Sequence, residues 1–173
     1  LPSEELGVGL QGVGAFAAEV PSFPNGCHIA EVEIDPETGE TRIDRYNVVD
    51  DIGTVINPLL AQAQIHGGVV QGVGQALLED VAYDRDSGQL LAGSFMDYGI
   101  PRADTMPEIK VDFSPVRSKS NPLGAKGVGE GGTVAGTPAI VNAILDALSP
   151  LGVRQIDTPV TPLRVWNAIN DAA

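Results

Sequence analysis

A glycine-rich loop around a single acid is the part of the sequence whose residue types suggest chemistry. Six of the residues from 124 to 136 are glycine, and Glu130 is the only carboxylate among them. Glycines let backbone N–H groups approach an anionic ligand closely, because no side chain intervenes. A carboxylate near apolar Val128 and Val134 is expected to be partly desolvated, and burial makes a carboxylate a stronger base. The alternative interpretation is a flexible surface loop.

A helix is predicted directly after this loop. Thr137 is a suitable N-cap and Pro138 a favoured first helical residue. Apolar residues then recur at helical spacing as far as Leu148. The sequence therefore predicts a helix over 138–148, and the positive end of its dipole would add to the attraction for an anion.

A second glycine-rich element has the same start signal, Asn57-Pro58. Apolar residues over 59–81 lie on one helical face: Val69, Val70, Val73, Leu77 and Val81. The same segment contains four glycines, each costing roughly 1 kcal/mol in a helix interior: Gly67, Gly68, Gly72 and Gly74. Two interpretations remain open. The glycines permit tight helix packing, or Gln71-Gly72 forms a wall of a polar cofactor site.

The other elements are predicted from alternation and turn residues. Two hairpins are expected, one from His28–Asp35 and Thr41–Asp50, the other from Val81–Tyr83 and Gln89–Tyr98. Ile109–Phe113 and Gly152–Asp157 are predicted as short strands, and Leu163–Ala172 as a last helix that buries Val165, Trp166 and Ile169. Gly7-Val8-Gly9 lacks the strand-then-helix context of a dinucleotide loop. The predicted fold class is α+β, with mixed sheets built from hairpins packed with about three helices, in one domain over 1–173.

Composition limits the possible partners. Hydrophobic residues make up 43% and charged residues 19%, as in folded globular proteins. The net charge of −13 disfavours nucleic acid and anionic membranes as partners. The acids of the first hairpin are expected to form a solvated face. Cys27, the only cysteine, fits a reducing, cytoplasmic compartment. No signal peptide is visible and no apolar run approaches membrane length, so no membrane insertion is expected. The chain opens at Leu1 without an initiator Met, as a piece of a longer protein would.

Four blocks in a fixed order carry a resemblance to a known family. They are FPNGCHIAEVEIDPETGE (23–40), VVDDIGTVINP (48–58), QIHGGVVQGVGQALLED (64–80) and NPLGAKGVGEGGTVAGTPAIVNAI (121–144), and the ending TPLRVWNAI (161–169) also fits. The chain resembles the C-terminal portion of the molybdenum-binding large subunit of the xanthine oxidase family of hydroxylases. The similarity is greatest to the carbon monoxide dehydrogenase large-subunit and aldehyde oxidoreductase types.

The resemblance implies a site. Glu130 corresponds to the family's active-site glutamate, which acts as a general base beside the metal. The cofactor is implied to be molybdenum in molybdopterin cytosine dinucleotide, with iron–sulfur clusters and FAD on other subunits or domains. None of the chain's residues is expected to ligate the metal. The positions implied to contact the cofactor are Gln71, Gly72, Lys126, Gly127, Val128 and Gly129.

The implied activity is insertion of water-derived oxygen into an aldehyde, an N-heterocycle or a carbon monoxide-like substrate. The implied partners are the rest of the large subunit, iron–sulfur and flavin subunits and a small-molecule substrate. The isolated chain is expected to be inactive and to hold little molybdenum. A non-catalytic cofactor-binding or subunit-assembly domain is the alternative. Nucleophilic catalysis is disfavoured, because neither His28 nor His66 stands near a matching nucleophile motif.

Overall fold

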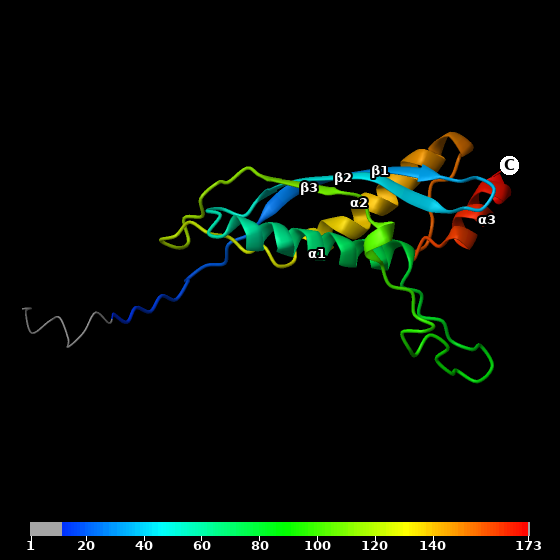
Figure 1. The fold of residues 1–173 in the computed structure, drawn as a ribbon, viewed down its shortest axis with the longest axis horizontal. Helices are drawn as coiled ribbons and strands as arrows, with labels where there is room; N and C mark the ends of the chain where they lie inside the picture. Colours follow the sequence, from blue (N-terminus) through cyan, green and yellow to red (C-terminus); the bar gives the residue numbers. More distant parts are fainter. Residues whose placement is uncertain (1–11, 173) are drawn as a thin grey trace, which may run out of the picture.

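A three-stranded sheet and three helices make up the body of the chain in a computed structural model that describes residues 12–172 (Figure 1). The sheet order is β1-β2-β3, with β1 and β2 antiparallel and β2 and β3 parallel. The predicted α+β class is confirmed, with one mixed sheet. The Gly7-Val8-Gly9 motif lies outside the described residues. The elements are β1 (Asn25–Ile34), β2 (Thr41–Asp51), α1 (Pro58–Leu77), η1 (Ala103–Thr105), β3 (Ile109–Phe113), α2 (Gly131–Leu148), η2 (Ser149–Leu151) and α3 (Pro162–Ala172).

The first predicted hairpin is confirmed as β1 and β2. Ile34 pairs with Thr41 at the closed end, and Gly39 in the turn takes a left-handed φ of 74°. The Asp35 carboxylate accepts the backbone N–H of Glu37 at 2.8 Å, which fixes the start of the turn. Turn chemistry of this kind is local, so the sequence was sufficient to predict it.

The helices α1 and α2 lie side by side against one face of the sheet (Figure 1). The core lies between these layers, and its most buried side chains are Tyr46 and Val48 from β2, Ile65 and Val69 from α1, and Ile140 and Ile144 from α2. The other face of the sheet is open, since Ile29 and Val49 are 57% and 47% exposed. The acids of the hairpin, Glu31, Glu33, Asp35, Glu37 and Glu40, are exposed as predicted.

The start of α1 follows its sequence signal. The Asn57 side chain accepts the backbone N–H of Leu60 at 3.2 Å, and Pro58 is the first helical residue. The helix ends at Leu77, before the predicted Val81.

The start of α2 differs from the prediction. The helix begins at Gly131, with Glu130 at the N-cap position, and Pro138 lies inside it. Thr137 is not a cap, because its hydroxyl donates to the Gly72 carbonyl across the helix pair at 3.0 Å. Packing of the first two turns against α1 compensates for the hydrogen bond that Pro138 cannot donate.

Three further predictions are wrong. The second hairpin is reduced to one bridge between Tyr83 and Leu90, on an arm that projects from the body (Figure 1, lower right). A two-stranded hairpin away from a core is marginally stable, which explains the short pairing. The segment Gly152–Asp157 is not a strand. Trp166 is 41% exposed, whereas its neighbour Val165 is fully buried.

The sequence-based statement that no apolar segment approaches membrane length is also corrected. The stretch Gly131–Leu151 is long and apolar enough to cross a membrane by length and composition alone. Ile140 and Ile144 in this stretch are fully buried in the core. The structure therefore uses α2 as a core helix.

Candidate functional site

The glycines of α1 and α2 bring the two helix backbones into contact. A Cβ added to Gly68 would lie 2.9 Å from the Thr133 nitrogen, and one added to Gly132 would lie 2.5 Å from the Ile65 carbonyl oxygen. One turn further on, a Cβ added to Gly72 would lie 2.8 Å from the Thr137 nitrogen. Of the two interpretations of the α1 glycines, tight packing therefore accounts for Gly68 and Gly72.

Two threonines of α2 fasten this contact, and the sequence did not predict their role. The Thr133 hydroxyl lies 3.1 Å from the Gly68 carbonyl and 3.4 Å from Oε1 of Gln71. Thr137 repeats the pattern one turn later with Gly72 and Gln75. The sequence pattern that could have predicted it is a repeat every four residues in both helices. Gly-Thr recurs in α2 at 132–133 and 136–137, and a Gly followed three residues later by Gln recurs in α1 at 68–71 and 72–75. A hydroxyl donates one hydrogen, and Thr133 gives it to the nearer Gly68 carbonyl, so the Gln71 side chain keeps at least one amide N–H without an acceptor among residues 12–172.

The loop before α2 exposes a short strip of backbone. Gly127 and Gly129 are exposed, a Cβ on either would meet nothing within 4 Å, and neither has a positive φ. Val128 between them packs its side chain against the core. Within the described part of the chain, the N–H groups of these three residues donate to no acceptor. We call residues 127–129 the donor strip. Neither packing nor backbone conformation within the described residues explains its glycines.

Lys126 points away from the donor strip. Its ammonium forms an ion pair with the Asp51 carboxylate, and both side chains are nearly buried. Its backbone N–H donates to the Ile52 carbonyl at 2.8 Å. The hydrogen bond from Lys126 lowers the pKa of Asp51 to about 2, and the backbone N–H groups of Val116 and Gly53 assist. Lys126 therefore anchors the base of the loop.

Glu130 is exposed at the first turn of α2. The expectation that its side chain is partly desolvated is not met within residues 12–172, where Glu130 is one of the exposed residues. It nevertheless lies close to α1, since Thr133 in the same turn contacts Gln71. Glu130 thus follows the donor strip directly and lies one turn before the Thr133–Gln71 contact, whereas Gly72 and Lys126 make internal contacts.

Two adjacent acids at the end of β2 were not predicted as special. Asp50 and Asp51 are both buried. Asp51 binds Lys126, and Asp50 contacts the ring of His28. The sequence feature that could have drawn attention to them is a pair of acids directly after the apolar end of a strand. His28 was predicted to be structural, and its contacts with Asp50 and Tyr46 agree.

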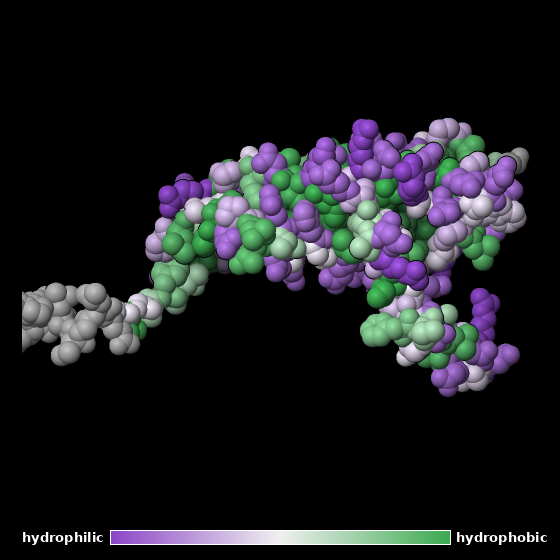
Figure 2. All heavy atoms as spheres, viewed as in Figure 1, coloured by the Kyte–Doolittle hydropathy of each residue, from purple (hydrophilic) through white to green (hydrophobic). Residues whose placement is uncertain are grey.

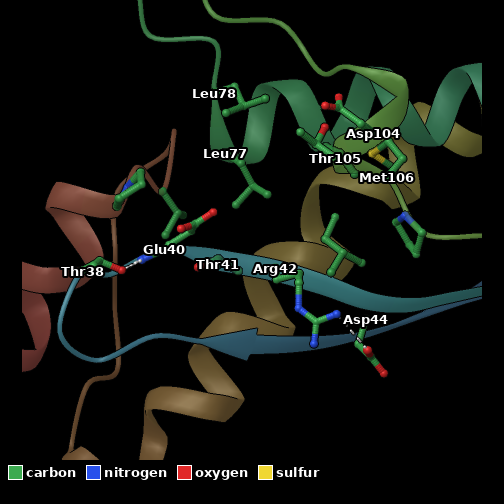
Figure 3. Close-up of a pocket in the computed structure, with 15 residues that line it drawn as sticks. Thr38, Glu40, Thr41, Arg42, Asp44, Leu77, Leu78, Asp104, Thr105 and Met106 are labelled. Atoms are coloured by element: carbon green, nitrogen blue, oxygen red, sulfur yellow. Dashed lines mark hydrogen bonds and ion pairs between the residues drawn. The ribbon is translucent and has the colours of Figure 1, made fainter.

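A pocket of about 600 Å³ lies elsewhere, at the C-terminal end of α1 (Figure 3). It is lined in part by Leu77 at the end of α1, Leu78 just after it, Thr41 of β2 and Met106. It contains none of the predicted site residues. In residues 12–172 no group of three or more His, Cys, Asp or Glu side chains is placed to hold a metal ion.

Comparison with known proteins decides the family. A family model described as a molybdopterin cofactor-binding domain matches residues 5–107. The chain belongs to this family. The glycine loop lies beyond the matched range, but full-length relatives align across it.

This molybdopterin-binding chain is 40% identical over 160 residues to the nicotine 6-hydroxylase large subunit of Paenarthrobacter nicotinovorans, an alignment covering 92% of the chain and 20% of the relative. It is 36% identical over 170 residues to the carbon monoxide dehydrogenase large chain of Hydrogenophaga pseudoflava, covering 98% and 21%. The quinoline 2-oxidoreductase structure from Pseudomonas putida 86 superposes with a TM-score of 0.82 at 42% identity, covering 86% and 19%. The chain spans about a fifth of the length of these relatives.

The exposed residues fit the anionic parts of a molybdopterin group. The donor strip offers three backbone N–H groups that have no acceptor within residues 12–172, with no side chains on its glycines, and Gln71 adds an amide. The N-terminus of α2 adds the positive end of a helix dipole beside them. Such a set binds phosphate or thiolate groups without a basic side chain, so Lys126 can remain internal.

Proposed function

We propose that this chain forms part of a molybdenum hydroxylase, with Glu130 as the general base. The observation that carries the proposal is the juxtaposition of an exposed carboxylate with the donor strip at the start of α2. Membership of the molybdopterin-binding family gives that juxtaposition its chemical meaning.

The backbone of the chain would hold the cofactor. An anionic group of the cofactor would come close to the N–H groups of residues 127–129, which a bulky side chain at either glycine would prevent. The dipole of α2 favours negative charge there. The Gln71 amide donates from the adjacent helix. When bound, the molybdenum cofactor supplies the two-electron acceptor for oxidation of the substrate. The cytosine dinucleotide form is proposed, with iron–sulfur clusters and FAD on other subunits.

Glu130 would accept a proton from the water-derived oxygen as that oxygen attacks an electrophilic substrate carbon. In an aldehyde or N-heterocycle a C–O bond would form as a C–H bond breaks, with two electrons passing to the bound cofactor and two protons released overall. Carbon monoxide would gain one oxygen with the same two-electron, two-proton balance and no C–H cleavage. The exposure of Glu130 in the described chain means that the rest of the large subunit must supply its cover. Substrates are proposed to be aldehydes, N-heterocycles or carbon monoxide-like molecules, in a cytoplasmic enzyme. The named relatives act on nicotine, carbon monoxide and quinoline.

The test is Glu130→Gln in the complete enzyme. The amide keeps the size of the side chain and removes the proton acceptor, so kcat should fall by about 10²–10⁴-fold. Molybdenum content should stay at the wild-type level, because the donor strip is intact. Asp146→Asn, an exposed acid on the same helix, is the matched control and should leave kcat unchanged. Wild-type turnover by a fully loaded Glu130→Gln enzyme would exclude the base role.

A non-catalytic cofactor-binding or subunit-assembly domain is the second candidate. The donor strip favours this candidate, because its backbone N–H groups could bind an anion whether or not Glu130 acts as a base. It predicts a full-length protein with bound cofactor and no hydroxylation of any aldehyde or N-heterocycle tested. Hydroxylation that depends on Glu130 would exclude it.

A further inference from the structure

Three buried side chains form a hydrogen-bonded row beneath the start of α2. Tyr46 is fully buried, and the side chains of His28 and Asp50 are 3% and 6% exposed. The Tyr46 hydroxyl lies 3.0 Å from Nδ1 of His28, and Nε2 of His28 lies 3.3 Å from Oδ1 of Asp50. The rings of Tyr46 and His28 also meet edge to face. We call Tyr46, His28 and Asp50 the buried row.

The hydrogen-bond balance gives the row a direction. The Tyr46 hydroxyl has no side-chain partner other than His28 within residues 12–172, so its hydrogen is best placed toward Nδ1. His28 then carries its own hydrogen on Nε2 and donates it to the Asp50 carboxylate. With this assignment, each of the two hydrogen bonds in the row has one donor and one acceptor. The row orients the carboxylate from one side.

On its other side the Asp50 carboxylate lies near the first residue of α2, without a hydrogen bond to it among the described residues. A Cβ added to Gly131 would lie 3.4 Å from Oδ2 of Asp50. A Cβ added to Gly26 would lie 1.9 Å from Oδ1, so only glycine at position 26 leaves room for this rotamer. The carboxylate therefore fills the space between β1 and the N-terminal end of α2. The first N–H groups of a helix have no intrahelical acceptor, and a nearby anion is attracted to them.

We propose that Asp50 is a positioning residue for Glu130, with the buried row holding its carboxylate against the start of α2. Glu130 immediately precedes Gly131 and has no side-chain cap of its own. The loop before it is tied to Gly53 and Thr54 through Ala125 and Gly124. Gly132 and Thr133 hold the first turn of α2 against α1, and Asp50 adds a charged group beside Gly131 on the side of the sheet. This inference rests on the base role proposed for Glu130. Burial raises the pKa of Asp50 and the contact with His28 opposes this effect, as expected of a carboxylate kept in place by its neighbours.

The test uses Asp50→Asn in the complete enzyme. If the amide oxygen keeps the contact with His28, the amide NH2 group takes the place of Oδ2 beside Gly131 and the negative charge is lost, so the first turn should shift. We expect kcat to fall by about 10–100-fold, with KM and molybdenum content unchanged, because Asp50 is buried inside the chain and belongs to neither the donor strip nor the exposed residues beside it. Hydrogen exchange in a peptide spanning 127–136 should become about tenfold faster. Exchange measures the helix start independently of activity.

Two further variants complete the test. Tyr46→Phe keeps the ring and removes the hydroxyl, and should cause the same changes to a smaller degree even if Asp50→Asn does not fold. Ile43→Val, a mild core truncation at the other end of β2, should leave both kcat and the 127–136 exchange unchanged. Equal effects from Ile43→Val and Tyr46→Phe would overturn the proposal, since general destabilisation would then explain both.

The outcomes separate this inference from the proposed function. If Glu130→Gln abolishes turnover while Asp50→Asn and Tyr46→Phe leave kcat and exchange at wild-type values, the positioning role fails alone. If Glu130→Gln retains turnover, the base role fails first. Faster exchange in 127–136 on Asp50→Asn would then show only that Asp50 holds the helix start, and the inference as stated would be overturned.

Discussion

Adjacent residues of one strand can face different environments, and Asp50 and Asp51 illustrate this. Asp50 points between β1 and α2, where burial raises its pKa against the opposing effect of His28. Asp51 points to Lys126, whose hydrogen bond lowers its pKa to about 2. Alternation along a strand sends neighbouring side chains to opposite sides. The two acids therefore fix two different segments, the start of α2 and the base of the glycine loop.

The lowered pKa of Asp51 makes a pH prediction. A carboxylate whose folded pKa lies below its unfolded value stabilises the fold above the unfolded pKa, near 3.8, and loses that contribution as the pH falls toward 2. The difference in unfolding free energy between wild type and Asp51→Asn should therefore be constant from pH 7 to pH 5. It should shrink between about pH 4 and pH 2.

Urea unfolding of both proteins at several pH values measures this difference. Asp84→Asn is a useful comparison, because Asp84 lies on the projecting arm and its pKa is lowered by hydrogen bonds from Ser87 in its own turn. Its effect should be small at every pH. A difference for Asp51→Asn that stays constant down to pH 2.5 would contradict the ion pair with Lys126.

At the scale of elements, the contact between α1 and α2 decides where the site lies. Paired glycines let the helices approach, and paired threonines hydrogen-bond across them. This contact begins α2 at Gly131 and draws Pro138 into the helix. Local signals alone predicted a later start at Pro138. The packing energy of two turns outweighed the local preference of Thr137 and Pro138 for a helix start.

Two neighbouring glycines test the helix contact. Gly68→Ala places a Cβ 2.9 Å from a backbone atom of α2 and should cost about 1–3 kcal/mol of unfolding free energy. Gly67→Ala adds the same atom to the same helix in open space and should stabilise the protein by roughly 0.5–1 kcal/mol. Chemical unfolding measures both. Equal effects from the two substitutions would contradict the close approach of the helices.

At the scale of the whole molecule, the described chain leaves much apolar surface open. Figure 2 shows apolar side chains on the projecting arm and around the body. Phe95 and Met96 on the arm are 86% and 92% exposed, and Leu59 at the start of α1 is 75% exposed. Surfaces of this kind are typical of buried interfaces. They fit a chain that spans about a fifth of the length of its relatives.

The open site leads to a prediction for the isolated 173-residue chain. The donor strip, Gln71 and Glu130 form one wall only, so a cofactor bound to them would keep most of its surface in water. We expect well below one molybdenum per chain when the chain is expressed alone in a cofactor-producing host, and no hydroxylation. Elemental analysis beside the complete enzyme as loaded control measures this. Near-stoichiometric metal on the isolated chain would contradict the prediction.

The sequence by itself determined the first hairpin, the cap at Asn57, the short strand at 109–113 and the α+β class, because turn and cap residues act on their immediate neighbours. It also singled out Glu130 and the glycines around it as the residues most suited to chemistry. Only the tertiary structure decided that Gly72 packs, that Lys126 pairs with Asp51, and that Glu130 is exposed. Those outcomes depend on which segments distant in sequence meet in space, and a carboxylate's burial is a property of its neighbours rather than of its own place in the chain.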